Sequence, residues 1–126
     1  MTEEIRAWLT GFEVAVRACD FEAARGLFAP DAVAFGTRAE EARGLDRIVV
    51  EQWRHVWPHI REFRLCDPLV RVKGDAAWVA TMWETRRPDG SEGVRRGRGT
   101  FVLERCDGRW LAVHSHFSVV PEDPQL

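Results

Sequence analysis

The sequence has no tyrosine, a single lysine (Lys73) and no long apolar run. No apolar stretch approaches the ~20 residues that a membrane-spanning helix requires. The opening stretch, MTEEIRAWLT, has neither a basic head nor the apolar core of a secretory signal. We therefore predict a cytoplasmic protein that does not associate with membranes.

Cysteine is also scarce, and the chain has no excess of positive charge. The three cysteines, Cys19, Cys66 and Cys106, are widely spaced and form no C-x-x-C pair. Such an odd, scattered set predicts reduced thiols in a reducing compartment. The net charge is −2 at pH 7, whereas nucleic-acid-binding domains normally carry a basic excess. We therefore expect no nucleic acid among the partners.

What the chain has is enough apolar material for one core. Its 126 residues suit a single domain spanning 1–126, and 45% of them are hydrophobic. Six tryptophans and seven phenylalanines supply most of the bulky surface. We expect an ordered core over about residues 3–119 and a polar tail over 121–126.

The first half of the chain predicts three helices. A helix over about 3–18 is indicated by apolar residues at helical spacing, namely Ile5, Trp8, Leu9, Phe12, Val16 and Cys19. Asp20 can cap a short second helix in FEAARGLF. A third helix near LDRIVVEQWRHVW ends at Pro58. Its apolar stripe consists of Val49, Trp53 and either Val56 or Trp57.

The second half reads as strands. After an early strand in AVAFG, the chain continues with a strand that is bent or bulged around Pro68, a long strand in AAWVATMWETRR, and strands in VRRGRGTFVLER and RWLAVHSHFSVV. Helices followed by a run of antiparallel strands predict an α+β fold, with helices on one face of a curved sheet.

The turn before the last strand sets which side chains share a face. RCDG fits a type I turn with Gly108 in the left-handed position, which places Arg105 opposite Arg109. In that register one face carries Phe101, Leu103, Leu111, Val113 and Phe117. The other, outward face carries Arg98, Thr100, Trp110, His114 and His116, with Arg98 opposite His116.

The stretch GDAAWVATMWETRRPDGSEGVRRGRGTFVLERCDGRWLAVHSHFS closely resembles the C-terminal half of SnoaL-like domains, within the nuclear transport factor 2-like superfamily. The ending is also similar to the association domain of calcium/calmodulin-dependent protein kinase II. The first half of the chain also resembles this family, in the stretches CDFEAARGLFAPDAVAF and GLDRIVVEQW. The resemblance therefore covers about residues 3–119. It implies a cone-shaped fold, in which a strongly bent antiparallel sheet wraps three N-terminal helices around a pocket. It also implies a homodimer formed through the outer sheet face.

The catalytic residues of related enzymes are not all present. The resemblance places the base of ketosteroid isomerase at Gly36, and the tyrosine donor of that enzyme has no counterpart in this chain. Glu84 is a candidate acid for polyketide-cyclase chemistry only where its strand turns it inward. Two histidines on one strand face could begin a zinc site with His55 or His59, but no further ligand is indicated. We predict neither a metal nor a cofactor, and leave open whether the protein is an enzyme.

The remaining expectations concern binding. We predict a pocket for a small hydrophobic or aromatic molecule, lined by Trp8, Phe12, Phe35, Trp53, Trp57, Trp83 and Phe101. The alternative is that these rings pack against one another as part of the hydrophobic core and leave no pocket. We expect a dimer face formed by Arg98, Trp110, His114 and His116. Two other functions stay open: a non-catalytic association module, and an isomerase or polyketide-cyclase-like enzyme with an unplaced pocket carboxylate.

Overall fold

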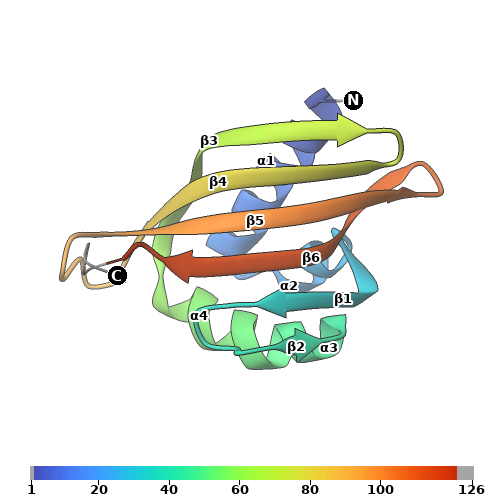
Figure 1. Ribbon diagram of the computed structural model, residues 1–126. Coiled ribbons are helices and arrows are strands. Elements are labelled where there is room, and N and C mark those ends of the chain that lie inside the picture. Colours follow the sequence, from blue (N-terminus) through green and yellow to red (C-terminus); the bar gives the residue numbers. More distant parts are fainter. Residues whose placement is uncertain (1, 122–126) are drawn as a thin grey trace.

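A curved six-stranded sheet with helices on one side forms the fold, in a computed structural model that describes residues 2–121. The helical elements are α1 Thr2–Ala18, α2 Phe21–Arg25, α3 Leu45–Ile48, η1 Val49–Trp53, α4 Arg54–Val56 and η2 Trp57–His59. The strands are β1 Phe28–Phe35, β2 Ala42–Arg43, β3 Arg61–Lys73, β4 Ala76–Arg86, β5 Val94–Cys106 and β6 Arg109–Val119. Figure 1 shows α1 behind the sheet and α3 and α4 at its lower edge, which confirms the α+β class.

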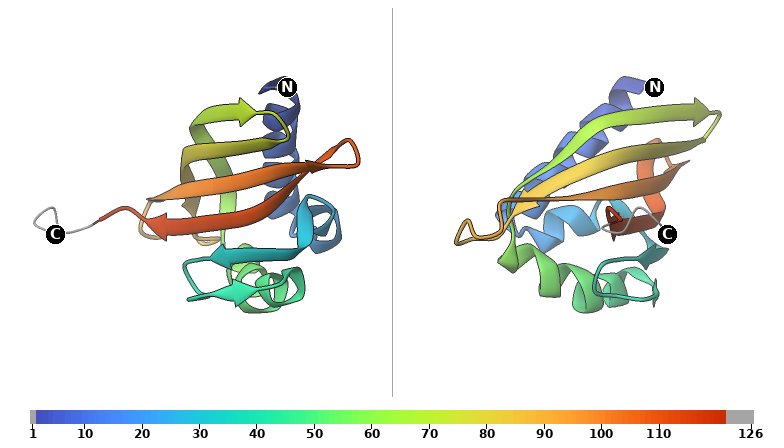
Figure 2. Two further views of the ribbon diagram at one scale, coloured as in Figure 1. Left: turned by 45° about the vertical axis from the view of Figure 1, so that its right-hand side comes forward. Right: turned by 60° about the vertical axis from the view of Figure 1, so that its left-hand side comes forward.

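The sheet has the strand order β2-β1-β6-β5-β4-β3. The strands from β3 to β6 pair antiparallel, as the sequence predicts. Strand β1 instead pairs parallel with β6, far away along the chain. Figure 2 shows the sheet twisted and curved, with α1 on its inner side. None of the helices within residues 2–121 is long and apolar enough to cross a membrane.

Helices α1 and α2 form where the sequence predicts them. The buried residues of α1 lie along one side and are Ile5, Trp8, Leu9, Phe12, Ala15 and Val16. Glu3 and Glu4 in the first turn and Arg17 in the last turn have the signs that the helix dipole favours. The Asp20 carboxylate then accepts a 3.0 Å hydrogen bond from the Ala23 N–H and caps α2.

The predicted third helix is one helical stretch, 45–59, that changes its winding along the way. Helix α3 passes into the π turn η1, returns to α-helix in α4 and ends in the 3-10 turn η2. Trp53 and Trp57 are both buried, because residues four apart across the α-helical turn α4 lie on the same side of the helix. Pro58 lies at the start of η2 and Ile60 is already extended, so the helix ends where Pro58 predicts.

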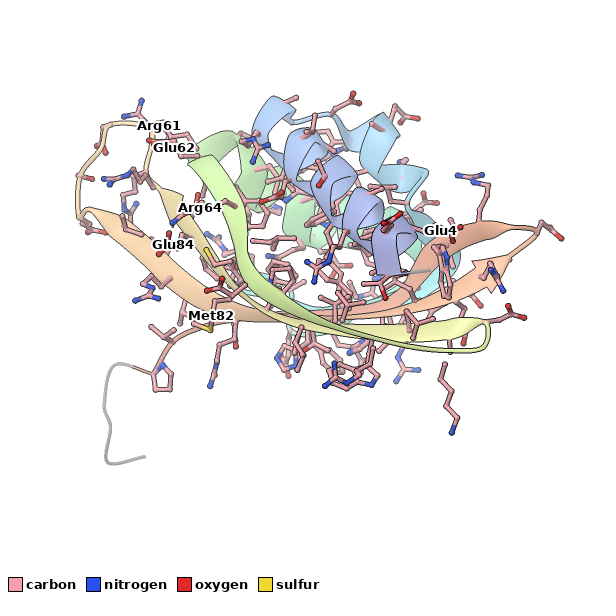
Figure 3. All side chains as sticks on the ribbon, turned by 90° about the horizontal axis from the view of Figure 1, so that it is seen from above. Glu4, Arg61, Glu62, Arg64, Met82 and Glu84 are labelled. Atoms are coloured by element: carbon pink, nitrogen blue, oxygen red, sulfur yellow. The ribbon has the colours of Figure 1, made fainter. Side chains whose placement is uncertain are left out.

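Strand β3 bends sharply as it leaves the helical stretch (Figure 1). Its pairing with β4 shifts between Cys66 and Leu69, on either side of Pro68. Proline has no N–H to donate to the ladder, and the preceding Asp67 has a positive φ of 51°. The predicted bulge is therefore confirmed. Figure 3, seen from above, shows the sheet curving around α1.

The predicted turn of the last hairpin is wrong. Arg109 lies opposite Cys106, not opposite Arg105. Asp107 and Gly108 form a two-residue turn, with φ values of 52° and 78°. Two consecutive positive φ values belong to the type I′ turn, whose twist matches that of the flanking strands. The hairpin therefore starts one residue out of the predicted register.

A bulge at Val113 then changes which side chains face the helices. The pairing of β6 with β5 shifts there, because the partner of Leu103 is Ala112 while the partner of Val102 is His114. Before the bulge, Trp110 lies on the inner, helix-covered face of the sheet, buried to 8% exposure. After it, the outer face carries both His114 and His116, as predicted. Trp110 is therefore on the opposite face from the histidines, and the prediction that it shares theirs is wrong.

Candidate functional site

An aromatic cavity lies between the inner face of the sheet, α1 and the helical stretch 45–59. Its volume is about 70 Å³. Seven aromatic rings line it, and they come from both the helices and the sheet: Phe12, Phe35, Trp53, Trp57, Phe63, Trp83 and Phe117. The Trp53 and Trp57 rings stack with centroids 4.6 Å apart, and Phe12 stands edge-on to Trp57 at 5.9 Å. The walls therefore suit a flat, apolar molecule.

Trp83 reaches the cavity because β5 has a glycine opposite it. Trp83 pairs with Gly97, and a Cβ added at Gly97 would lie 2.0 Å from the indole ring. The ring thus lies against bare backbone, where its N–H donates to the carbonyl oxygen of Arg98 at 3.1 Å. Two residues on, Gly99 leaves room for the ring of Phe117, which stacks with Trp83 at 6.3 Å.

Of the seven residues predicted for the pocket, those that line the aromatic cavity are Phe12, Phe35, Trp53, Trp57 and Trp83. Trp8 and Phe101 are not part of its lining. Their rings pack edge to face with centroids 4.9 Å apart, and the Trp8 indole N–H donates to the Leu27 carbonyl oxygen at 3.0 Å. These two rings belong to closed core. Phe35 is 36% exposed and lies at the mouth.

Sequence reasoning missed part of the lining, namely Val16, Ala34, Gly36, Thr37, Gln52, Val56, Ile60, Phe63, Thr85, Arg95, Ser115 and Phe117. Strand alternation could have found some of these. Thr85 follows Trp83 by two residues, and Arg95 precedes Gly97 by two, so both share the inner face. Ser115 could not be found this way, because the bulge at Val113 decides its direction.

Gln52 ties the loop after β1 to the helical stretch. Its Oε1 accepts hydrogen bonds from the N–H groups of Arg38 and Ala39, both at 2.8 Å, and its Nε2 donates to Thr37 Oγ1 at 3.0 Å. A Cβ at Gly36 would lie 2.5 Å from the Gln52 side chain, so glycine leaves the space for it. At Gly36, where the resemblance places the isomerase base, the space above the backbone is therefore filled by the Gln52 side chain.

The polar groups of the lining include no aspartate, glutamate or histidine. The Thr85 hydroxyl donates to the Arg61 carbonyl oxygen at 2.8 Å. The Ser115 hydroxyl and the Arg95 guanidinium make no hydrogen bond or ion pair with any other described residue. The lining thus offers apolar area and two unpartnered polar groups, without a carboxylate base.

Glu84, the candidate acid, lies on the outer face of the sheet. Figure 3 shows it next to Arg64 at the bent end of the sheet, and its carboxylate lies 2.7 Å from the Arg64 guanidinium and 3.5 Å from that of Arg96. The hydrogen bond from Arg64 and the charges of both arginines hold the pKa of Glu84 below its ordinary value. The residue is therefore an ionised surface group, not a proton donor in the cavity.

Both histidines of β6 lie on the outer face. His116 is opposite Thr100, and His114 Nδ1 lies 2.7 Å from the carbonyl oxygen of Val33. The ring of Phe35 stands edge-on to both imidazoles, at 5.2 and 5.5 Å. Within residues 2–121, no group of three or more His, Cys, Asp or Glu side chains is placed to hold a metal ion.

The two other residues predicted for the dimer face lie on opposite sides of the sheet. The Trp110 indole points inward and donates to Glu4 Oε2 at 2.7 Å, while the Arg105 guanidinium covers its ring at 5.4 Å. Arg98 stays on the outer face, but it lies opposite Ser118 and donates to its Oγ at 3.3 Å. The predicted pairing of Arg98 with His116 is therefore wrong.

A shallower groove adjoins the mouth of the aromatic cavity. The two share Phe35, Gly36, Thr37, Arg95 and Phe117, and the groove adds Glu40, Glu41, His116, Ser118 and Val119. Glu41 is engaged by Arg43 at 2.8 Å, and that hydrogen bond holds the pKa of Glu41 below its ordinary value. Arg95 thus stands where the cavity and the groove meet.

Solved structures with the same architecture are numerous. A nuclear transport factor 2-like protein of unknown function from Pseudomonas putida KT2440 is 25% identical, with a TM-score of 0.86 over 98% of this chain and 88% of that one. A protein from Xanthomonas campestris, proposed to be a calcium/calmodulin-dependent protein kinase II association domain, is 22% identical, with a TM-score of 0.82 over 98% and 90%. No curated protein matches the sequence.

The family comparison agrees with the fold. The model of the SnoaL-like domain family matches residues 5–122, almost the whole chain. A nuclear transport factor 2-like superfamily protein from Salmonella enterica serovar Typhimurium LT2 is 21% identical, with a TM-score of 0.79 over 97% of this chain and 93% of that one. The expected resemblance is therefore confirmed: the chain belongs to the SnoaL-like domain family and has the nuclear transport factor 2-like fold.

Proposed function

We propose that the protein binds a small hydrophobic or aromatic molecule in the aromatic cavity. The observation that carries this proposal is the lining itself: seven aromatic rings surround space that they do not fill. Ligand sites in proteins are commonly apolar and aromatic, with few polar groups that orient the ligand. The Ser115 hydroxyl and the Arg95 guanidinium supply such groups here.

The size of the cavity implies that it widens when a ligand binds. Its volume of about 70 Å³ is smaller than the ~150 Å³ of a cavity that holds benzene. The cavity and the groove share two rings, of which Phe35 is exposed at the mouth and Phe117 is half-buried, so we expect the Phe117 ring to move. Burying ~200 Å² of an aromatic ligand contributes about 5 kcal/mol before the cost of association. Taken alone, this gain corresponds to a dissociation constant of about 0.2 mM, and the cost of association moves the expected value into the millimolar range.

The test compares two tryptophans that differ in place. Trp53→Ala removes a ring of the cavity wall, whereas Trp78→Ala removes an outer-face ring that is 43% exposed. Isothermal titration with naphthol should show unchanged affinity for Trp78→Ala and at least about tenfold weaker binding for Trp53→Ala. Equal affinity in all three proteins would contradict binding in the cavity.

A filling variant covers the case in which Trp53→Ala fails to fold. Val56→Phe adds a ring at a half-buried position of the lining, and Val50→Phe adds one on the same helical stretch at a position that is 49% exposed. We expect Val56→Phe to block naphthol binding and Val50→Phe to leave it intact. If naphthol binds Val56→Phe as tightly as it binds Val50→Phe, the ligand does not bind in the aromatic cavity.

The outer face favours a second function, homodimerisation. Two large apolar side chains there are open to solvent, Leu69 at 46% and Trp78 at 43% exposure. We propose that this face pairs with its copy in a second chain, because such apolar patches mark interaction sites. Light scattering should give a dimer mass for the wild type and a monomer for Trp78→Glu. Val14→Glu, which alters a valine on α1 that is 53% exposed, should remain dimeric.

The two functions can be separated. A non-catalytic association module would keep its dimer and bind no naphthol in any variant, whereas a binding protein would lose naphthol in Val56→Phe and keep its dimer. An isomerase or cyclase that uses a pocket carboxylate gains no support, because the described lining contains none.

A further inference from the structure

We propose that the ligand of the aromatic cavity is an elongated aromatic acid. Its carboxylate binds Arg95 at the mouth, and a polar group at its far end meets the Ser115 hydroxyl. This inference rests on the proposed function, because it names the chemical class of the molecule that the cavity holds. Two polar groups of the lining carry it, and they come from different strands.

Arg95 differs from its neighbours on β5 in having no partner. Arg96 and Arg98 point to the outer face, where Arg96 lies 3.5 Å from Glu84 and Arg98 donates to Ser118 at 3.3 Å. Arg95 points to the inner face and lines both the cavity and the groove. It makes no ion pair or hydrogen bond with any other residue in the range 2–121.

The surroundings of Arg95 favour an anionic ligand. A guanidinium presents a planar set of donors that matches a carboxylate in two parallel hydrogen bonds. Of the two acids in the adjoining groove, Glu41 is engaged by Arg43 and Glu40 makes no ion pair with Arg95. Arg95 is exposed at the mouth, so the guanidinium is free to rotate toward a ligand while water screens part of the attraction. A ligand carboxylate would therefore supply the partner that the protein lacks.

Ser115 is the second group without a partner. The residue is 7% exposed, and its hydroxyl makes no hydrogen bond with any other described residue. No enclosed side-chain oxygen or nitrogen of the described residues lacks a partner, so the Ser115 Oγ keeps contact with open space. Because Ser115 lines the aromatic cavity, a ligand that enters can provide a hydrogen bond. A hydroxyl or carbonyl oxygen on the ligand would do so.

The separation of the two groups sets the length of the ligand. Ser115 lies opposite Phe101 on β5, and Arg95 comes six residues earlier on the same strand. At the rise of an antiparallel strand, the two backbone positions are roughly 20 Å apart. The Arg95 side chain bridges part of this distance. A single ring is too short to reach both groups, whereas two fused rings with substituents at opposite ends can.

The experiment uses three probes on the same two-ring frame. They are a naphthoic acid with a hydroxyl on its far ring, the same acid without the hydroxyl, and the hydroxylated amide, which has no charge. Each is titrated calorimetrically into the wild type and into Arg95→Met, Ser115→Ala and Arg98→Met. The last variant removes an arginine from the outer face of the same strand and serves as the control.

We expect Arg95→Met to weaken binding of both acids by about tenfold and to leave the amide unchanged. Ser115→Ala should weaken the hydroxylated acid more than the plain one, and Arg98→Met should change nothing. Added salt should lower the affinity of the acids alone. Equal effects of Arg95→Met and Arg98→Met, or an amide that binds as tightly as the acid, would overturn the inference.

Failure of the inference differs from failure of the proposed function. If the amide and naphthol bind, Val56→Phe blocks them, and Arg95→Met has no effect on the acids, then the cavity binds neutral molecules and only the anionic class is wrong. If no probe binds the wild type, both the inference and the proposed function fall.

Discussion

Replacing Gly97 by alanine tests whether the wall of the aromatic cavity depends on bare backbone in β5. The added Cβ would lie 2.0 Å from the Trp83 indole and 2.4 Å from the carbonyl oxygen of Ser118. The Ser118 carbonyl belongs to the backbone of β6, so it cannot move without disturbing the pairing of β5 with β6. Trp83 can swing away, but it then loses its hydrogen bond to Arg98.

The magnitude follows from these two costs. Overpacking a core typically costs about 1–3 kcal/mol, and a lost hydrogen bond from a buried indole adds about 1–2 kcal/mol. We therefore expect Gly97→Ala to lower the free energy of unfolding by about 3 kcal/mol, and the melting temperature by roughly 10 °C. Urea unfolding followed by circular dichroism measures the first, and calorimetry the second.

Gly99→Ala provides the matched comparison on the same strand. Its Cβ would lie 3.1 Å from the Phe117 ring, which can shift by a few tenths of an ångström. We expect a loss of about 1 kcal/mol or less. A Gly97→Ala protein as stable as Gly99→Ala would refute the reasoning, because it would show that Trp83 does not depend on the glycine beneath it.

Three further changes test other parts of the account. Trp110→Phe removes the hydrogen bond to Glu4 and should lower the free energy of unfolding in urea by about 1–2 kcal/mol. An unchanged free energy of unfolding would indicate that the Trp110 side chain points outward. Asp20→Ala removes the cap of α2 and should cost about 1 kcal/mol by the same measurement. The hydrogen bond from Arg64 holds the pKa of Glu84 below its ordinary value. The pair therefore stabilises the fold at any pH above the ordinary carboxyl pKa, and this stabilisation is lost as the pH falls through the lowered pKa of Glu84. Glu84→Gln should therefore flatten the acid limb of the stability profile, and an unchanged limb would contradict the ion pair.

The elements that the sequence predicts well are those set by local chemistry. The apolar spacing of α1, the Asp20 cap and the stop at Pro58 depend on residues close together along the chain, and all three are confirmed. The bulge at Pro68 is of the same kind, because proline lacks the N–H that the ladder needs. Strand β1 shows the limit: its parallel partner, β6, lies at the other end of the chain.

The candidate site shows why one register error matters. The type I′ turn and the bulge at Val113 each shift the pairing of β6 by one residue. Together they shift it by two, which returns His114 and His116 to the predicted face but gives them other partners, whereas Trp110 lies before the bulge and changes face. No residue type near Val113 marks the bulge, and Ser115 could therefore not be assigned to the cavity. Arg95 was within reach of simple alternation from Gly97, but its lack of a partner became visible only in the structure.

Native mass spectrometry of the purified protein tests the central claim most directly. The protein is sprayed from volatile buffer with the two-ring acid, and any small molecule retained from purification is released and identified. Binding in the aromatic cavity predicts one ligand per chain on the wild type and on Val50→Phe, and none on Val56→Phe. A wild-type spectrum free of bound molecules at every ligand concentration, or equal loading of Val56→Phe, would contradict the claim.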